Sequence, residues 1–428
     1  MKIFGEYNIL QDKTVLVYDD GYSVSLAEEL SKTFKKVLYY VPWKATKPIV
    51  NDYFIGYNVE NIERIDNIFE HIKDVDLFVF TSIFNGDLQC FLEDKCGKLV
   101  SGSRKAEKLE IDRVYSKKLL KQLGLPVTNY EVIQGTEELH KYLQEHKDVY
   151  VKINGKFRSL FETFHCDEYV LAELEIDEIE GMLGAVGDEF EFVVEEAIPD
   201  SVEVGLELIS VNGLYSKKNM VGIEIKNRFY VGRIMNRCDI PEEITIITDK
   251  LAPIFSGFGY KGPYSDEIRV TKDHKSYMLD FCCREPIPPG YLRQFMMKNY
   301  GSMLYYAALG QVVEPEYDHE YGAELILDSR SNEKNFTPII IPPEYRNNVR
   351  LNKYMIHNDV PYVIPNGFLG SVVASADSIE EAIKETIKIA ESIKCSDITF
   401  DIHSADKALE EIEKLNEYGI NFFENKDE

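Results

Sequence analysis

The chain has 428 residues, enough for two or three domains, and its 44% hydrophobic and 29% charged residues are typical of a folded protein. The formal net charge of −26 disfavours a general surface for nucleic acid or anionic membrane, because phosphate groups would be repelled. A local basic pocket for a nucleotide is still compatible with this charge.

The seven cysteines include no CxxC pair and show no zinc-site spacing with the eight histidines. An odd, scattered set of this kind is typical of reduced thiols in a cytoplasm. The N-terminus lacks the long apolar core of a signal peptide, and no apolar run approaches the roughly 20 residues that cross a bilayer. We therefore expect a cytoplasmic protein with no membrane segment.

Residues 1–102 alternate short apolar runs with helical patterns, which predicts a parallel sheet in a small doubly wound, Rossmann-like domain. The segment Asp19–Gly21 lacks the glycines of a dinucleotide site, so this prediction concerns the fold alone. Ser25 and Glu28 are expected to form a capping box at the first helix. Strands are expected at 14–18, 37–41 and 77–81, and helices around 62–72 and 87–92.

Residues 103–312 are expected to form a second domain after a small, polar linker at 97–103. Its first part, about 126–200, is an expected lid subdomain. From Phe190 the density of strand patterns predicts an antiparallel sheet. Strands are expected at 130–133 and 149–153, and helices at 110–123, 137–145, 170–183, 242–258 and 291–309.

Residues 313–428 are expected to form a third, small α+β domain. Ser378 and Glu381 form an expected capping box at its first helix. Strands are expected at 323–327, 338–341 and 370–374, and helices at 379–393 and 405–415.

Two carboxylates face each other on an expected hairpin. Asp280 ends an apolar strand that begins at Tyr277, and Glu267 lies on the preceding strand, with a turn at Asp273–Lys275 between them. A carboxylate at the end of a buried strand needs a cation or strong donors to offset its desolvation. The pair could bind Mg²⁺ through oxygen or form ordinary sheet-edge ion pairs, and the pattern alone favours neither.

A lysine and several glutamates upstream have candidate roles as well. Lys152 nearly ends the apolar strand in VYVKING, where a cation can reach nucleotide phosphates; a lysine that only extends into solvent is the alternative. In FVVEEAI the backbone from Glu196 to Ile198 could contact an adenine edge, and Glu203 could accept ribose hydroxyls. A solvated acidic face is the alternative for these glutamates.

The order of these features resembles the ATP-grasp superfamily, and most closely its phosphoribosylamine–glycine ligase family. VYVKING is similar to that family's VIKADG, FVVEEAI to its VIEEFL, and YMLDFCCR to its metal-binding EFNCR. LEIDRVYSKKLLKQLGLPVTNY resembles the family's entry helix, and LGSVVASADSIEEAIKETIKIAESIK its last domain. Each motif alone is degenerate, but their order over nearly the whole chain is fairly specific.

The resemblance implies an α/β fold, α+β in part: an ATP-grasp fold with an N-terminal Rossmann-like domain and a small C-terminal α+β domain. It implies ATP and one or two Mg²⁺ ions as cofactors, with small carboxylate and amine substrates, in a monomer or homodimer. The implied residues are Arg113, Lys117, Lys152, Arg158, Ser159, Glu196, Ala197, Ile198 and Glu203 for ATP, and Glu267 and Asp280 for the metal. Arg284, Lys226 and Arg233 would hold the transferred phosphoryl group and the acyl phosphate, with Lys226 and Arg233 as one basic cluster.

The departures from the family concern the phosphate loop and the metal site. GKFRSLFETF replaces a Gly-rich lid, so that Arg158 and Ser159 would substitute for backbone N–H groups. GIEIKNRFYVGRIM replaces the loop that faces the phosphoribosyl substrate. Cys282 stands where the family has an asparagine, and a neutral thiol is a poor Mg²⁺ ligand.

The function that the resemblance implies is ATP-dependent, ADP-forming joining of a carboxylate to an amine through an acyl phosphate. The replaced loop predicts a substrate other than phosphoribosylamine. Two alternatives stay open: a degenerate scaffold that binds a nucleotide or a partner without turnover, and a kinase that stops at a phosphorylated product.

Overall fold

The computed structural model describes residues 10–42, 53–155, 163–331, 335–365 and 367–423. Among these residues, the N-terminal region forms a five-stranded parallel sheet in the order β3-β2-β1-β4-β5. The residues of the central strands after their first positions are apolar, because both faces of the sheet are buried, which confirms the expected Rossmann-like arrangement. The elements are β1 (Thr14–Tyr18), α1 (Val24–Ser31), β2 (Lys36–Tyr40), β3 (Ile62–Ile65), β4 (Leu77–Phe80), α2 (Gly86–Asp94) and β5 (Leu99–Ser101).

Two expectations for this region are wrong. The helix expected at 62–72 is instead the edge strand β3, which pairs with β2, and a short 3₁₀ turn at Ile68–Glu70. Apolar residues at three-residue spacing fit a helix, but pairing with the sheet edge prevails. The capping box at Ser25 is absent because α1 begins at Val24, and Glu28 instead pairs with Arg346 at 3.0 Å.

A second sheet, eight-stranded within the described residues, is antiparallel and has the order β14-β13-β10-β11-β12-β15-β20-β17. The sheet continues across residue 313, since β12 pairs directly with β15. The division into 1–102, 103–312 and 313–428 therefore stays a prediction. The strands are β10 (Ser201–Val211), β11 (Lys218–Ile225), β12 (Phe229–Asn236), β13 (Lys261–Thr271), β14 (Ser276–Cys282), β15 (Tyr321–Ser329), β17 (Val349–Leu351) and β20 (Gly367–Ala376).

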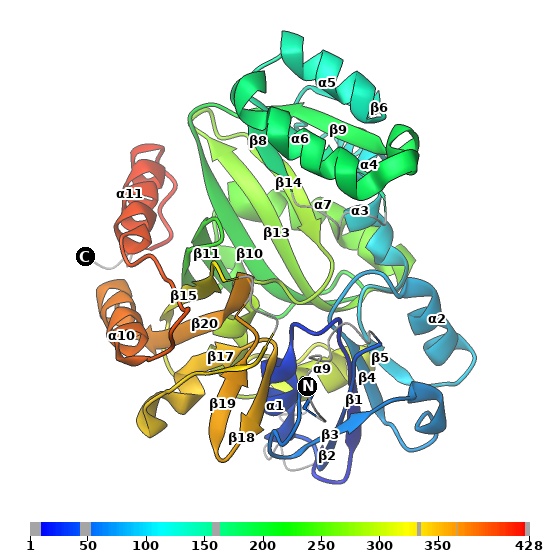
Figure 1. Cartoon of the computed structure of the whole chain (residues 1–428), viewed down its shortest axis with the longest axis vertical. Coiled ribbons are helices and arrows are strands. Elements are labelled where there is room, and N and C mark those ends of the chain that lie inside the picture. The colour runs from blue at the N-terminus through cyan, green and yellow to red at the C-terminus, as the bar shows by residue number, and fades with distance from the viewer. Residues whose placement is uncertain (1–9, 43–52, 156–162, 332–334, 366, 424–428) are drawn as a thin grey trace.

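A third sheet, in the order β6-β9-β7-β8, is packed against helices α5 and α6 around its own apolar core. It lies at the top of Figure 1, beyond α3 and α4 and near the end of β14. Its described elements fall within the expected lid, and we call this unit the lid. They are β6 (Tyr130–Gln134), α5 (Thr136–Glu145), β7 (Val149–Ile153), β8 (Phe164–Cys166), α6 (Tyr169–Leu183) and β9 (Glu191–Glu196).

Two expected long helices are each divided. The helix expected at 110–123 consists of α3 (Glu107–Ile111) and α4 (Arg113–Gln122), because Asp112 leaves the helical conformation and its carboxylate accepts the Tyr115 N–H at 2.8 Å. This break places Arg113 in the first turn of α4. The helix expected at 291–309 is likewise divided into α8 (Gly290–Met296) and α9 (Tyr300–Ala308).

The C-terminal helix α10 (Ile379–Ser392) packs on β15 and β20. Its predicted capping box is confirmed at the N-cap, since the Ser378 hydroxyl accepts the Glu381 N–H at 3.2 Å. In the parts of the chain that the structure covers, no helix is long and apolar enough to span a bilayer. The remaining elements are α7 (Glu242–Phe258), β16 (Thr337–Pro338), β18 (Tyr354–His357), β19 (Val360–Val363) and α11 (Ser404–Glu417).

Candidate functional site

The hairpin of β13 and β14 pairs the two predicted metal carboxylates, Glu267 and Asp280, directly across the ladder. The register shifts next to Glu267, so that Leu279 is an extra residue without a partner of its own on β13. The Leu279 carbonyl accepts a hydrogen bond from Lys152 Nζ at 3.0 Å. The bulge therefore provides a backbone acceptor beside the two carboxylates. The predicted opposition of Glu267 and Asp280 is confirmed.

Asp280 forms ion pairs with two cations that the chain places far from it in sequence. Its Oδ2 lies 3.1 Å from Lys152 Nζ, and its Oδ1 lies 3.2 Å from Arg113 Nε. Arg113 also donates to the Ile153 carbonyl at the end of β7. Both basic side chains are less than one tenth exposed. The lid and the large sheet therefore meet at these ion pairs.

A second buried pair lies behind the first. Lys117 Nζ is 2.5 Å from Glu195 Oε2, which also accepts the Thr128 hydroxyl at 2.8 Å. Lys152 is 3.4 Å from the other oxygen of Glu195. Burial alone would lower the pKa of Lys152, but Asp280 and Glu195 outweigh it and the pKa is raised. Burial would raise the pKa of Glu195, but Lys152 and Lys117 lower it.

We call Arg113, Lys117, Lys152, Glu195 and Asp280 the basic cluster. Its three cations and two carboxylates leave one excess positive charge in a buried place. A buried excess of positive charge is stabilised by a bound anion. The cluster is therefore suited to the phosphate groups of a nucleotide.

An acidic cluster lies beside it on one face of the large sheet. It consists of Glu203 on β10, Glu224 on β11 and Glu267 on β13, with two cations between them. Lys226 lies 3.0 Å from Glu267 and 4.0 Å from Glu224, and Arg269 lies 3.4 Å from Glu203. With all five groups ionised, the three carboxylates and two cations would carry one excess negative charge.

The electrostatics of the acidic cluster favour a further cation. Burial raises the pKa of Glu224 to about 8; Lys226 acts to lower it, and Glu267 adds to the rise. Burial likewise raises the pKa of Glu203. Glu207, four residues beyond Glu203 on the same face of β10, has one buried carboxylate oxygen without a hydrogen-bond partner. Buried carboxylates of this kind fit a hard divalent cation, because such ions prefer oxygen ligands.

Cys282 lies on the same strand as Asp280 and is buried. Its register partner is Ser265, two residues from Glu267. Burial raises the pKa of the Cys282 thiol, so the group stays protonated at neutral pH. A neutral thiol is a poor ligand for Mg²⁺ and a poor nucleophile.

Arg284 follows the hairpin and faces the N-terminal sheet. Its Nε lies 3.1 Å from Glu110 Oε1, and the other oxygen of Glu110 accepts the Cys283 N–H at 2.8 Å. Asp20, just after β1, is close enough for Arg284 to lower its pKa, although burial has the larger effect and the pKa is raised. The carboxyl ends of β1 and β4 therefore lie beside Arg284. A crevice between two such strands, where the strand order reverses, is the usual ligand position in parallel sheets.

The structure separates Arg233 from Lys226. The prediction that these two residues form a single cluster of cations is therefore wrong. Lys226 lies in the turn of the β11–β12 hairpin, whereas Arg233 lies in the middle of β12, opposite Val221. Arg233 donates to the Phe422 carbonyl at 3.1 Å and lies over the Tyr321 ring. Its described contacts tie β12 to the C-terminal segment.

The predicted adenine segment, Glu196 to Ile198, begins at the last residue of β9 in the lid. The Ala197 N–H donates to the Asp148 carbonyl at 3.3 Å, and the Ile198 carbonyl accepts the Ser201 hydroxyl at 2.7 Å. The Glu196 carboxylate accepts from Asn129 at 2.8 Å. Arg158 and Ser159 lie outside the described residues.

Glu224 and Glu110 were not among the predicted site residues. Glu224 stands in the alternating segment GIEIK, where only its position on the face shared with Glu203 and Glu267 distinguishes it from an ordinary strand residue. Glu110 is buried at the end of α3, and its buried position has no sequence signature. Both assignments depend on contacts between distant segments.

No protein family matches the sequence, and no curated protein sequence is detectably similar to it. Solved structures do resemble the fold. Phosphoribosylamine–glycine ligase from Thermotoga maritima superposes with a TM-score of 0.65 at 15% identity, over 90% of this chain and 98% of that chain. L-amino acid ligase from Bacillus licheniformis gives 0.59 at 14% identity, over 91% and 99%.

The biotin carboxylase domain of Hydrogenobacter thermophilus 2-oxoglutarate carboxylase, in complex with MgADP, ADP and bicarbonate, gives a TM-score of 0.65 at 12% identity. The match covers 96% of this chain and 99% of that chain. These three proteins are ATP-grasp enzymes, and the chain has the ATP-grasp fold. At these identities the likeness establishes the fold alone.

Proposed function

We propose that the chain is an ATP-dependent, ADP-forming ligase that joins a small carboxylate to an amine. One observation carries this proposal: a buried cluster with excess positive charge adjoins a cluster of three carboxylates across the β13–β14 hairpin. A nucleoside triphosphate with a bound divalent cation has complementary charges, anionic phosphates next to a metal ion. The ATP-grasp fold supports the same assignment.

In this proposal Lys152 and Arg113 bind the phosphates, and the backbone from Glu196 to Ile198 contacts the adenine. Glu267 and Asp280 would hold Mg²⁺, which supplies charge neutralisation at the β- and γ-phosphates when bound. Glu203 was expected at the ribose, but its position in the acidic cluster supports a charge role beside Glu267 equally well.

The reaction transfers the γ-phosphoryl group to a carboxylate oxygen of the substrate and releases ADP. The amine nitrogen then attacks the acyl carbon, the C–O bond to phosphate breaks, and phosphate and a proton leave as the amide forms. Arg284 would hold the acyl phosphate, because it follows the hairpin and is close enough to act on Asp20 at the end of β1. Catalysis of this kind depends on positioning and charge stabilisation rather than on a protein nucleophile.

The carboxyl ends of β1 and β4, where the strand order reverses, support an acceptor site for the second substrate. Asp20 offers a carboxylate there that suits an amine, and Arg284 offers a cation that suits a carboxylate.

We propose a cytoplasmic location, supported by seven cysteines that all lie in described regions and form no disulfide. The monomer or homodimer expectation stays open.

A second candidate function is nucleotide binding without turnover. The observation that favours it is the neutral, buried Cys282 at a position where the family has an oxygen ligand. A kinase is the third candidate, since phosphoryl transfer alone would need the same two clusters.

The test measures ADP, phosphate and amide formation by the full chain with Mg-ATP across a panel of paired carboxylates and amines. We expect ADP release only when both substrates are present, and Asp280→Asn should reduce it by roughly 100-fold or more. Asp273→Asn is the matched control, because Asp273 lies on the exposed turn of the same hairpin and pairs only with neighbours in that turn.

The other outcomes identify the other candidates. ATP binding without ADP release in every pairing would establish the scaffold, and a phosphorylated product without amide would establish the kinase. Full activity in Asp280→Asn would overturn the site assignment.

A further inference from the structure

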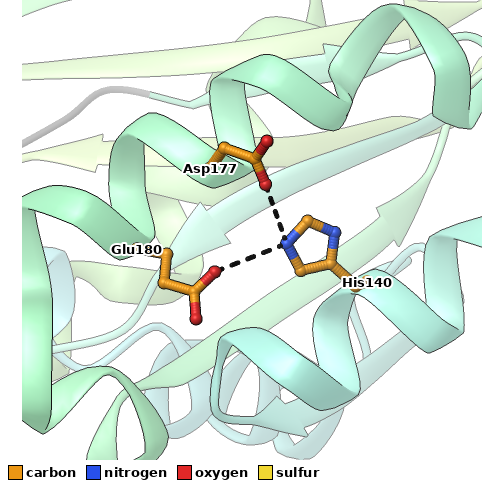
Figure 2. A group of neighbouring side chains, drawn as sticks. All are labelled: His140, Asp177 and Glu180. Atoms are coloured by element: carbon orange, nitrogen blue, oxygen red, sulfur yellow. Dashed lines mark ion pairs between the residues drawn. The ribbon is translucent and has the colours of Figure 1, made fainter.

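The two helices of the lid bring together three possible metal ligands that lie apart from the basic and acidic clusters. His140 on α5 points toward Asp177 and Glu180 on α6, as Figure 2 shows. Asp177 and Glu180 are three residues apart on one helix, so both side chains face α5. The three ligand atoms all lie within 4.8 Å of one another.

The distances suit a bound ion better than a direct contact. His140 Nε2 is 3.5 Å from Asp177 Oδ1 and 3.9 Å from Glu180 Oε2. Good hydrogen bonds between nitrogen and oxygen are about 2.7–3.2 Å long. Ligands bound at about 2.0–2.2 Å in a tetrahedral metal site are roughly 3.3–3.6 Å apart; the Asp177 distance lies in this range and the Glu180 distance is slightly longer.

The two carboxylates lack a basic partner in the described chain. No lysine or arginine nitrogen of a described residue lies within 4.0 Å of Asp177 or Glu180, and the His140 ring is their shared neighbour. The nearest lysine on α5, Lys141, instead pairs with Glu137 and Glu138. A cation bound between α5 and α6 would therefore neutralise the negative charge of Asp177 and Glu180.

The second ring nitrogen of His140, Nδ1, forms an outer hydrogen bond of the kind that metal-binding histidines have. Nδ1 lies 2.9 Å from the Tyr169 hydroxyl, and that hydroxyl donates to Glu173 at 3.3 Å. When the Tyr169 hydroxyl donates to Glu173, Nδ1 of His140 donates to the Tyr169 oxygen. In that tautomer the Nε2 lone pair is directed at the two carboxylates. An outer hydrogen bond of this kind fixes the orientation of a ligating imidazole.

We propose that His140, Asp177 and Glu180 bind a divalent transition-metal ion of the Zn²⁺ type, which clamps α5 to α6. The imidazole nitrogen favours such an ion over Mg²⁺, and water completes the coordination, because both carboxylates are half exposed. The inference is independent of the proposed function, since none of these residues belongs to the basic or acidic cluster.

A neighbouring group in the lid provides a matched contrast. His165 lies near Asp148 and Asp167 and has the same kinds of ligand atoms. Its Nε2 is only 2.8 Å from Asp148, which is a direct hydrogen bond with no space for an ion between the two atoms. The geometry therefore assigns metal binding to the first group alone.

The test is calorimetric titration of the full chain with Zn²⁺ in excess Mg²⁺, which keeps the Glu267 and Asp280 site occupied. We expect one Zn²⁺ site whose affinity falls at least tenfold in His140→Gln and in Glu180→Gln, while His165→Gln binds as the wild type does. Glu180 is exposed, so its variant folds even if the His140 variant does not. The melting temperature of the wild type should rise with Zn²⁺, and that of Glu180→Gln should not.

The absence of a Zn²⁺ site in the wild type, or unchanged affinity in Glu180→Gln, would overturn the proposal. Loss of binding in His165→Gln would also overturn it. Diffraction at the zinc absorption edge gives an independent readout, with a peak expected between α5 and α6.

Discussion

Lys152 Nζ lies 3.1 Å from Asp280 Oδ2, although Lys152 comes from β7 of the lid and Asp280 from β14 of the large sheet. Each residue was predicted to bind a different part of Mg-ATP, one a phosphate and the other the metal. In the structure they neutralise each other. Under the proposed function, nucleotide binding would exchange this ion pair for two new ones and would thereby act on the contact between the lid and the sheet.

Lys152→Met should weaken ATP binding by roughly 30-fold, because it removes a buried, charge-assisted hydrogen-bond donor. It should also destabilise the chain, since Glu195 and Asp280 each lose one buried cationic partner. Calorimetry with a non-hydrolysable ATP analogue measures the first effect and urea unfolding the second. Lys275→Met is the control, because Lys275 is exposed at the turn of the same hairpin and pairs with Asp273.

Cys282→Asn should lower the Mg²⁺ concentration needed for half-maximal nucleotide binding by about tenfold, because an amide oxygen is a better ligand for Mg²⁺ than a neutral thiol. Cys282→Ala is the matched variant without a ligand atom and should leave the Mg²⁺ requirement near that of the wild type. Equal requirements in the asparagine and alanine variants would show that Cys282 does not face the metal.

Glu224→Gln should remove part of the pH dependence of stability. The pKa of Glu224 is raised to about 8, so between its ordinary value and about pH 8 the folded chain retains a proton that the unfolded chain has lost. The wild type should therefore lose stability as the pH rises through this window, on the order of 2 kcal/mol from this group. Urea unfolding at about pH 5.5 and pH 8 measures the loss, which should be smaller in the glutamine variant. An unchanged pH dependence would contradict the assignment.

Lys226→Met and Arg233→Met should have different effects, because the structure separates these residues. Lys226→Met removes the cation nearest Glu267 and should alter the Mg²⁺ dependence of nucleotide binding. Arg233→Met should lower the free energy of unfolding by about 1–2 kcal/mol, since Arg233 holds the Phe422 carbonyl, and leave nucleotide affinity unchanged. If the Arg233 variant also changed the Mg²⁺ dependence, Arg233 would act at the same site as Lys226, as first predicted.

The amino-acid sequence by itself determined several local features: the strands β1, β2 and β4 of the parallel sheet, the capping box at Ser378 and the opposition of Glu267 and Asp280 across one hairpin. These follow from the alternation, spacing and turn residues of short segments, which act within a few residues of the chain. Sequence order also indicated the ATP-grasp fold.

Only the tertiary structure decided which charges meet. Arg113 reaches Asp280 because Asp112 breaks the helix and because the lid docks on β14. Glu224 joins the acidic cluster because β10 pairs with both β11 and β13, whereas Arg233 lies away from Lys226 because the register places it in the middle of β12, opposite Val221. Strand register and the docking of distant elements depend on the packing of the whole chain, and no local pattern records them.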